Sequence, residues 1–313
     1  MSNYVATIDL GTNTFHLLIA KIQPNRDFQL IYRERIPVMI GQGSINQGFI
    51  TPEAEGRAIA ALTQFKSKLT FYQVPLEQVR CTATSAFRNA KNGQELANKI
   101  TQTTEITVDI ITGEQEAEYI YYGVRQAIPL SDENSLIMDI GGGSVEFILC
   151  NQDQVFWKQS FEIGAQRLLD RFNIQDPITE DNTGTLLNYF AKNLTPLATA
   201  INQYHPVTLI GASGTFDTLS EIYQHRSNTV VEESAPELPL TPEAFQQMLR
   251  DFSRMNRDQR LAIPGMIEMR VDMIVPASWL IHFVLETYQI HHIRVSSYAL
   301  KEGLMTQLAK RFS

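Results

Sequence analysis

One short pattern, an aspartate followed by an apolar residue and a glycine, occurs twice in this 313-residue chain, each time between two strand-like runs. The first copy is Asp9–Thr14 (DLGTNT) and the second is Asp139–Ser144 (DIGGGS). They lie about 130 residues apart, a distance typical of one ordinary domain. Because each copy opens a strand–turn–strand unit, the repeat predicts two α/β domains with the same core topology.

Hydrophobic periodicity and capping signals place the other elements. Thr51-Pro52-Glu53 is typical of a helix start, and that helix is expected to end near Phe71. We expect strands over 4–9, 14–22, 79–83, 107–111, 136–139, 145–150, 207–210 and 292–296, and one strand or two over 27–40. Further helices are expected around 95–100 and over 114–125, 179–202, 241–255, 264–288 and 298–311. The predicted domains are 1–125 with the C-terminal helix 298–313, and 126–297, each with a mixed sheet flanked by helices.

Composition and charge exclude several classes of protein. A net charge of −8 argues against a nucleic-acid partner, which needs a broad basic face, but it allows a phosphate ligand held by local donors. Asp9 interrupts the first apolar run, and no basic segment precedes it, so we expect no signal peptide. The run Met273–Leu285 is too short to span a membrane and is predicted to be a buried helix. Cys81 and Cys150 are too few for a disulfide framework or a zinc site and are expected to be buried in a reducing, cytoplasmic protein.

The first acid–glycine turn has the residues of a phosphate loop. Gly11 allows a sharp turn, and successive backbone N–H groups with Thr12, Asn13 and Thr14 can surround a phosphate. Asp9 is expected to hold a metal or a metal-bound water rather than phosphate. A plain hairpin turn is the alternative for this segment alone.

The second turn carries three consecutive glycines, Gly141, Gly142 and Gly143, followed by Ser144. Such a run is costly in conformational entropy, and a close approach of backbone to ligand explains it most simply. Asp139 and Glu146 offer hard oxygen ligands suited to Mg²⁺, which commonly binds one or two carboxylates together with substrate phosphate. The alternative is a flexible turn.

Two further segments carry candidate chemistry. In Thr82–Asn89 a strand end is followed by Thr84, Ser85 and a helix start, so free N–H groups and the side chain of Arg88 could bind an anion; an ordinary capped helix with a surface arginine is the alternative. In Gly113–Glu118 the acids are also typical of a helix first turn. A glutamate there, beside a phosphate site, could act as the base that activates water.

Taken together, these segments resemble the exopolyphosphatase / guanosine pentaphosphate phosphohydrolase family, part of the superfamily of actin, sugar kinases and heat-shock ATPases. The resemblance runs nearly end to end, and the ordered set of runs is far more specific than any single one. The runs are IDLGTNTFHLLIA (8–20), TATSAFRNAKN (82–92), ITGEQEAEYIYYGV (111–124), IMDIGGGSVEFIL (137–149), GASGTFD (211–217) and ALKEGLM (299–305).

The resemblance implies two actin-like (ribonuclease H-like) domains with a cleft between them and a role for each motif residue. Glu116 is the expected base, with Glu114 and Glu118 as weaker candidates, and Arg88 is similar to the family's phosphate-clamping arginine. Asp139 and Glu146 match its magnesium-linked acids. The implied phosphate binders are Asn13, Thr14, Thr84, Ser85, Gly142, Gly143 and Ser144, and a glycine turn over 211–215 adds Gly211, Ser213, Gly214 and Thr215. The implied cofactor is Mg²⁺, with a monovalent cation as a further candidate; the substrate is polyphosphate or guanosine pentaphosphate, and a homodimer is a candidate assembly.

Some positions depart from the family pattern. Ser297-Tyr298 stands where an acid–glycine pair is usual, and a glycine expected after Ile274–Val275 is replaced in Pro276-Ala277-Ser278. Both changes put nucleotide recognition by the second domain in doubt. Longer members continue into a further helical domain, and for a short member we expect weak processivity. The competing hypotheses are an actin-fold kinase or ATPase, and a non-catalytic sensor of polyphosphate or alarmone.

Overall fold

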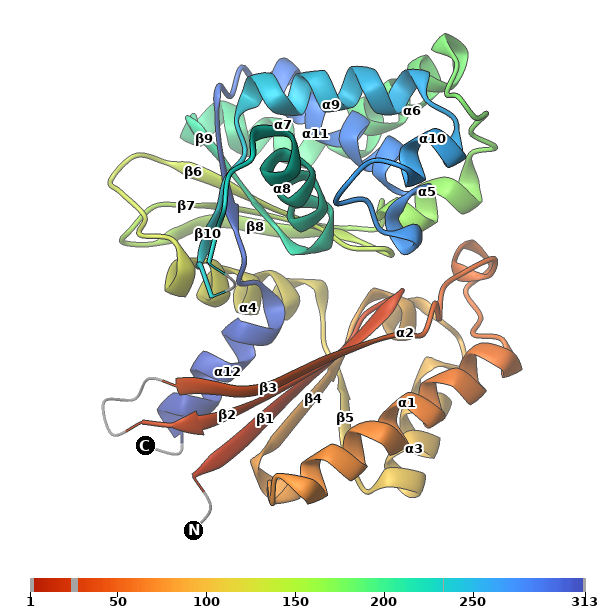
Figure 1. Ribbon diagram of the computed structural model, residues 1–313, viewed down its shortest axis with the longest axis vertical. Coiled ribbons are helices and arrows are strands. Elements are labelled where there is room, and N and C mark those ends of the chain that lie inside the picture. The colour runs from red at the N-terminus through yellow and green to blue at the C-terminus, as the bar shows by residue number, and fades with distance from the viewer. Residues whose placement is uncertain (1–2, 24–27, 233, 312–313) are drawn as a thin grey trace. The chain divides into compact units, whose positions relative to one another are not determined.

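The computed structural model describes residues 3–23, 28–232 and 234–311 (Figure 1). The chain divides into two compact units, 1–123 with 299–313, and 124–298. Each unit contains one mixed β-sheet flanked by helices, so the predicted fold class is confirmed.

The first unit is built on a five-stranded sheet. Its elements are β1 (Tyr4–Leu10), β2 (Thr14–Ile22), β3 (Phe28–Pro37), η1 (Ile45–Gln47), α1 (Pro52–Phe71), η2 (Leu76–Gln78), β4 (Val79–Ala83), α2 (Ser85–Asn89), α3 (Gly93–Thr104), β5 (Val108–Ile110), α4 (Gly113–Ala127) and α12 (Leu300–Arg311). The strand order is β3-β2-β1-β4-β5. The first three strands form an antiparallel meander, and β4 and β5 run parallel to β1.

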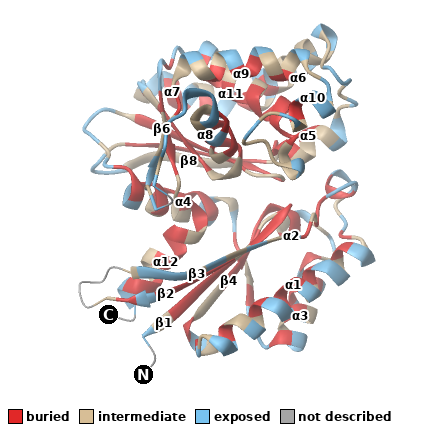
Figure 2. Ribbon diagram, viewed as in Figure 1, coloured by how far each residue is buried: buried red, intermediate tan, exposed pale blue. Residues whose placement is uncertain are grey.

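Alternating side chains of the strands serve the two faces of this sheet. Ile8 and Leu10 of β1 belong to the core cluster that also contains Leu62 and Phe65 of α1. Val5 of the same strand packs on the opposite face, in a cluster with residues of α12. Figure 2 shows β1 and β2 largely buried, whereas the edge strand β3 is exposed or half-buried, and exposed residues lie along the outer sides of the helices.

The second unit carries a six-stranded sheet in the order β10-β11-β9-β6-β7-β8. Its elements are β6 (Ser135–Ile140), β7 (Val145–Cys150), β8 (Val155–Phe161), α5 (Ala165–Arg171), α6 (Glu180–Asn193), α7 (Thr195–Tyr204), β9 (Thr208–Ala212), α8 (Ser213–Ser227), β10 (Glu237–Leu238), α9 (Pro242–Arg254), α10 (Arg257–Leu261), η3 (Glu268–Arg270), α11 (Ile274–Tyr288) and β11 (His292–Ser296). As in the first unit, three strands form an antiparallel meander (β6, β7, β8), and the next two run parallel to the first of them. The predicted repeat of core topology is confirmed; β10 is an addition.

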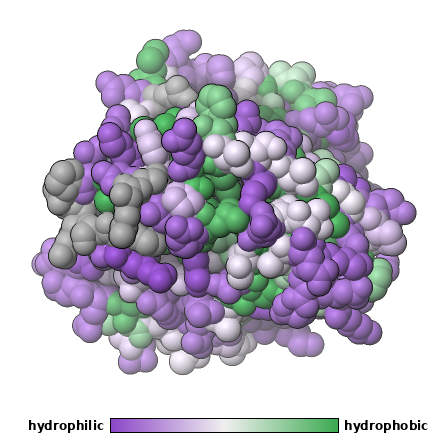
Figure 3. Space-filling view, turned by 90° about the horizontal axis from the view of Figure 1, so that it is seen from below, coloured by the Kyte–Doolittle hydropathy of each residue, from purple (hydrophilic) through white to green (hydrophobic). Residues whose placement is uncertain are grey.

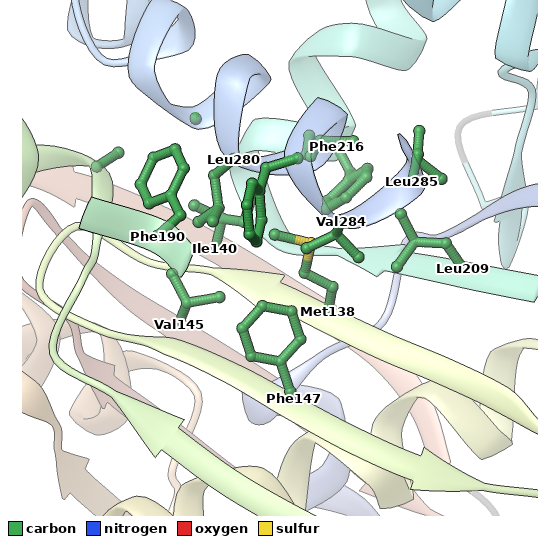
Figure 4. Close-up of a cluster of buried hydrophobic side chains, with 14 of the residues drawn as sticks. Met138, Ile140, Val145, Phe147, Phe190, Leu209, Phe216, Leu280, Val284 and Leu285 are labelled. Carbon is green, nitrogen blue, oxygen red and sulfur yellow. The ribbon is translucent and has the colours of Figure 1, made fainter. Parts of the chain in front are cut away.

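Helices α6, α8 and α11 cover one face of this second sheet. Phe216 of α8 and Leu280 and Val284 of α11 gather over Met138 of β6 in one buried cluster (Figure 4). Helix α11 contains the run predicted as a buried helix, and ten of its residues are buried. Among the described helices, none combines the length and the apolar character needed to cross a membrane.

Three predicted elements are wrong in detail. The helix expected over 179–202 is two helices, α6 and α7, because Pro196 in the first turn of α7 has no N–H to continue the ladder. The helix expected from residue 264 starts at Ile274, after a turn in which Gly265 has φ +91°. The glycine turn expected over 211–215 is a direct junction, since β9 extends through Ala212 and α8 begins at Ser213.

Candidate functional site

The loop between β6 and β7 has its carbonyl groups bonded on one side. The Gly141 carbonyl accepts from Ala165 N at 2.9 Å, and the Gly142 carbonyl accepts from Gln166 N at 2.9 Å, both at the start of α5. The Gly143 carbonyl accepts from the Arg167 side chain, whose Nε lies 3.0 Å away. Gly164 packs so closely on this loop that a Cβ there would lie 2.5 Å from backbone atoms of the loop. The carbonyl groups are therefore fixed by α5 and by Arg167.

Most N–H groups of the same loop, unlike its carbonyl groups, have no hydrogen-bond partner among the described residues. Within the described part of the chain, those of Gly142, Gly143 and Ser144 donate no hydrogen bond, while Gly141 N donates to Ser144 O at 3.0 Å. Consecutive backbone N–H groups without protein acceptors are available to donate to an anion. That this loop binds phosphate stays a prediction.

The loop between β1 and β2 is held in a similar way. The Thr12 carbonyl accepts from Ile40 N at 2.8 Å, and the Asn13 carbonyl accepts from Met39 N at 2.8 Å. Arg57 of α1 holds this bracing segment in turn, since its Nε donates to Val38 O at 2.7 Å. In both units, then, a following segment and an arginine fix the carbonyl side of the loop.

Asp139 and Glu146 are directly opposite each other on β6 and β7, so their side chains lie on the same face of the sheet. Both are buried, with 5% and 1% of their surface exposed. Ser213 Oγ donates to Asp139 Oδ2 at 2.6 Å, and Ser160 Oγ donates to Glu146 Oε1 at 2.6 Å. Two buried acids side by side repel each other unless a cation or a proton neutralises them. The pair therefore fits a divalent cation with hard oxygen ligands.

The third predicted metal ligand, Asp9, lies in the first unit. It is opposite His16 in the β1–β2 ladder and opposite Thr82 in the β1–β4 ladder. Among the described residues, no group of three or more acids, histidines or cysteines is arranged to hold a metal ion. A two-carboxylate site is still sufficient for Mg²⁺, which commonly completes its coordination with water and substrate phosphate.

Arg88 and Glu116 meet in the first unit. Arg88 lies in the last turn of the short helix α2, Glu116 lies in the first turn of α4, and Arg88 Nη1 donates to Glu116 Oε2 at 2.8 Å. The same nitrogen donates to Ile111 O at 3.1 Å. Both side chains are mostly buried, with 18% and 9% exposed. A neighbouring guanidinium favours the ionised form of a carboxylate, which is the form that can accept a proton.

The neighbouring acids of α4 have different surroundings. Glu114 is exposed, and Glu118 accepts a hydrogen bond from the Tyr122 hydroxyl at 2.9 Å. Of these three glutamates, only Glu116 is buried, so the structure separates it from the two weaker candidates.

Thr84 and Ser85 are buried beside this pair. Thr84 Oγ1 donates to Leu10 O at 3.4 Å, and Ser85 Oγ accepts from Asn89 Nδ2 at 3.2 Å. Helix α2 contains five residues, so its dipole is small. The prediction that Thr84 and Ser85 bind phosphate stays a prediction.

The predicted phosphate binders at the β9–α8 junction fall into two groups. Gly211 and Thr215 are buried, and Gly211 lies under the Phe216 ring, where a Cβ would collide with it. Ser213 and Gly214 are half-buried, and Ser213 contacts Asp139. Gly211 thus has a clear packing role, because the aromatic ring fills the space of its missing side chain.

Three arginines near these loops were missed by sequence reasoning. Arg57 and Arg167 brace the two loops, and the Arg270 guanidinium lies directly against Gly214. Each arginine lies in a segment outside the motif that it contacts. An isolated arginine in a sequence carries no local pattern that predicts such a contact. The bracing role of Arg167 could have been suspected from one signal alone, namely a basic residue in the first helix that follows the predicted phosphate loop.

The two departures from the family pattern have structural explanations. Pro276, Ala277 and Ser278 are buried in the first turns of α11. Ser297 Oγ donates to Ala235 O at 2.8 Å and ties β11 to the preceding segment.

The surface seen in Figure 3 is mostly hydrophilic, with a small apolar area near its centre. The exposed large apolar residues are scattered, in agreement with a surface dominated by polar side chains. They are Leu30, Ile31, Phe49, Phe71, Val207 and Val230.

Comparisons with known proteins identify the family of the chain. The model of the Ppx/GppA phosphatase family matches residues 18–312. A crystal structure of an exopolyphosphatase from Cytophaga hutchinsonii superposes with a TM-score of 0.93 at 45% identity, covering 98% of both chains. Exopolyphosphatase 2 of Mycobacterium tuberculosis is 30% identical over 97% of this chain and 98% of its own length. The guanosine-5'-triphosphate,3'-diphosphate pyrophosphatase of Photobacterium profundum is 27% identical over 99% of this chain and 60% of its own length. The chain therefore belongs to the Ppx/GppA phosphatase family, as its motifs predict, and is a hydrolase that acts on phosphoanhydride bonds.

Proposed function

We propose that this enzyme releases terminal orthophosphate from inorganic polyphosphate by attack of water. The support is the exopolyphosphatase from Cytophaga hutchinsonii, which is 45% identical along nearly its whole length. Guanosine pentaphosphate is the second candidate, because a pyrophosphatase named for that compound is 27% identical over 99% of this chain. Both substrates present a terminal phosphoanhydride to the enzyme.

Binding of the terminal phosphate is assigned to the loop amides. The N–H groups of Gly142, Gly143 and Ser144 would donate to phosphate oxygens, while α5 and Arg167 hold the carbonyls away from that charge. Asn13 and Thr14 would contribute in the first unit. Because these donors are fixed before the substrate arrives, little reorganisation is needed as charge develops.

A divalent cation fits the paired acids Asp139 and Glu146, and Mg²⁺ is our candidate. When bound, such a cation neutralises charge on the phosphoryl oxygens. In each acid one oxygen accepts a serine hydroxyl, which orients the carboxylate. Four points stay predictions: that Asp9 is a further metal ligand, that a monovalent cation binds, that the enzyme is a homodimer and that it is cytoplasmic.

The contact between Arg88 and Glu116 is the observation that carries the catalytic assignment. The buried Glu116 carboxylate, 2.8 Å from the Arg88 guanidinium, would take the proton from the attacking water. Arg88 would orient this carboxylate through the same contact and supply positive charge for the transferred phosphoryl group. A sensor that only binds phosphate has no need of a buried base, which disfavours that alternative.

The test is Glu116→Gln, with the exposed Glu114→Gln as the matched control. Phosphate release from polyphosphate with Mg²⁺ should fall by about 10²–10⁴-fold in Glu116→Gln, while polyphosphate binding largely survives. Glu114→Gln should keep the rate of the unmodified enzyme. An unchanged rate in Glu116→Gln would overturn the assignment of the base.

Two assays address substrate and reaction class. Phosphate release from polyphosphate and from guanosine pentaphosphate, measured side by side, identifies the preferred substrate. Incubation with ATP and candidate sugars tests the kinase alternative, which requires sugar-dependent release of ADP.

A further inference from the structure

Ser213 has a backbone conformation that serine rarely adopts. Its φ is +67°, in the left-handed region, where residues other than glycine are disfavoured. Ser213 is the first residue of α8, directly after β9, although the next residue, Gly214, is the one that would adopt this conformation at no cost. Such outliers persist only where the surrounding structure enforces them, and they cluster at functional sites.

The fold itself does not require this conformation. The first unit has the corresponding junction between β4 and α2, in a sheet of the same strand order. There Ser85 is the first residue of the helix, as Ser213 is in α8, and no residue from 82 to 89 has a positive φ. The strain at Ser213 is therefore a local property of the second unit and calls for a local reason.

The hydrogen bond to Asp139 supplies that reason. Ala212 is the register partner of Asp139 in the parallel β6–β9 pair, so Ser213 lies one residue beyond the acid on the neighbouring strand. From this position its hydroxyl reaches Asp139 Oδ2 at 2.6 Å.

The start of α8 is firmly anchored. Phe216 is fully buried, packs on Gly211 and joins the cluster with Met138 and Leu280 (Figure 4). This packing fixes the first turn of α8 over the sheet and can enforce the conformation of Ser213.

We infer that Ser213 is a positioning residue that fixes the Asp139 carboxylate for the divalent cation, and that its strained backbone is retained for this bond. The inference rests on the proposed role of Asp139 as a cation ligand. Partners of metal-binding carboxylates orient them, and their loss commonly weakens metal binding by 10–100-fold. Ser213 makes no chemical step in this account; it acts through Asp139.

The test compares Ser213→Gly with Ser213→Ala. Both variants lose the hydroxyl, but only glycine relieves the positive φ. The melting temperature of Ser213→Gly should therefore exceed that of Ser213→Ala by several degrees. Both should need about tenfold more Mg²⁺ for half-maximal phosphate release, and both should show a smaller rise in melting temperature on adding Mg²⁺ without substrate.

Ser220→Ala is the matched control, since it removes another buried hydroxyl of α8, one that donates to Pro239 O at 2.8 Å. It should lower the melting temperature and leave the Mg²⁺ requirement unchanged. The inference is overturned if both Ser213 variants keep the Mg²⁺ requirement of the unmodified enzyme, or if Ser213→Gly is no more stable than Ser213→Ala. Asp139→Asn separates the two proposals. If Asp139→Asn also keeps the Mg²⁺ requirement of the unmodified enzyme, the proposed cation site is wrong. If Asp139→Asn changes the Mg²⁺ requirement and both Ser213 variants keep it, only the role of Ser213 is wrong.

Discussion

Replacing Gly303 by alanine tests the packing that closes the first unit. Gly303 belongs to the run ALKEGLM and lies in α12, where it crosses α4 at Gly123. A Cβ on Gly303 would lie 2.7 Å from the Tyr119 carbonyl carbon, closer still to its oxygen, and 3.0 Å from Gly123 N. Ordinary contact begins at 3.4 Å, so the two helix backbones would have to separate by at least several tenths of an ångström.

The expected magnitude follows from two opposing effects. Alanine in a helix interior is favoured over glycine by about 1 kcal/mol. Overpacking of a close contact costs about 1–3 kcal/mol, and rigid backbone on both sides places this case at the upper end. Gly56→Ala in α1 provides the favourable effect alone, because nothing lies within 4 Å of a Cβ there. The difference in stability between the two variants therefore isolates the steric cost.

Differential scanning calorimetry of the two variants and the unmodified enzyme measures this difference. We expect Gly56→Ala to melt slightly above the unmodified enzyme and Gly303→Ala below it, with a gap on the order of 5 °C. Equal melting temperatures for the two variants would refute the reasoning, because the helix-propensity effect is common to both.

Three further outcomes are expected. Arg167→Gln should raise the KM for polyphosphate roughly tenfold, because the Gly143 carbonyl loses its charged donor, whereas Arg171→Gln in the same helix should leave the KM unchanged. Steady-state kinetics measure both variants, and equal KM values would contradict the bracing role of Arg167. Cys81 and Cys150 should resist thiol reagents at pH 8 until the protein unfolds, because burial raises the pKa of the Cys81 thiol and raises the pKa of the Cys150 thiol to about 12. Rapid labelling of either thiol in the native protein would contradict this prediction. Treatment with EDTA should abolish phosphate release, and added Mg²⁺ should restore it; a rate unaffected by EDTA would contradict a divalent-cation requirement.

Much of the fold was predictable because local patterns agree with tertiary structure. The strand Val145–Cys150 and the strand His292–Ser296 are found with the predicted bounds. The Thr51 cap starts α1 where expected, and its side chain accepts from Ala54 N at 3.3 Å. The repeated acid–glycine pattern also predicted the shared sheet topology, because each copy reports the same strand–turn–strand unit.

The errors arise where one residue outweighs a periodic pattern. Pro196 divides a continuous apolar periodicity into two helices, since its ring removes one backbone donor. At 211–215 the glycines suggested a turn, but Gly211 is required by the ring of Phe216, a contact that no local pattern reveals. The bracing by Arg57 could not be predicted either, because it depends on where α1 places a side chain relative to a loop far away in the sequence.

The comparison of the two repeats indicates where chemistry was added to a common frame. Both loops have carbonyl groups fixed by hydrogen bonds, and both follow an aspartate near the end of a strand. The differences lie at the next strand–helix junction. In the first unit that junction leads to Arg88 and its partner Glu116, and in the second it holds Ser213 in a strained conformation against Asp139. Because the strand order is the same in both units, neither feature is a consequence of topology. Under the proposed function, each would meet one requirement of hydrolysis: a base for water in the first unit and a cation site for the phosphoryl charge in the second.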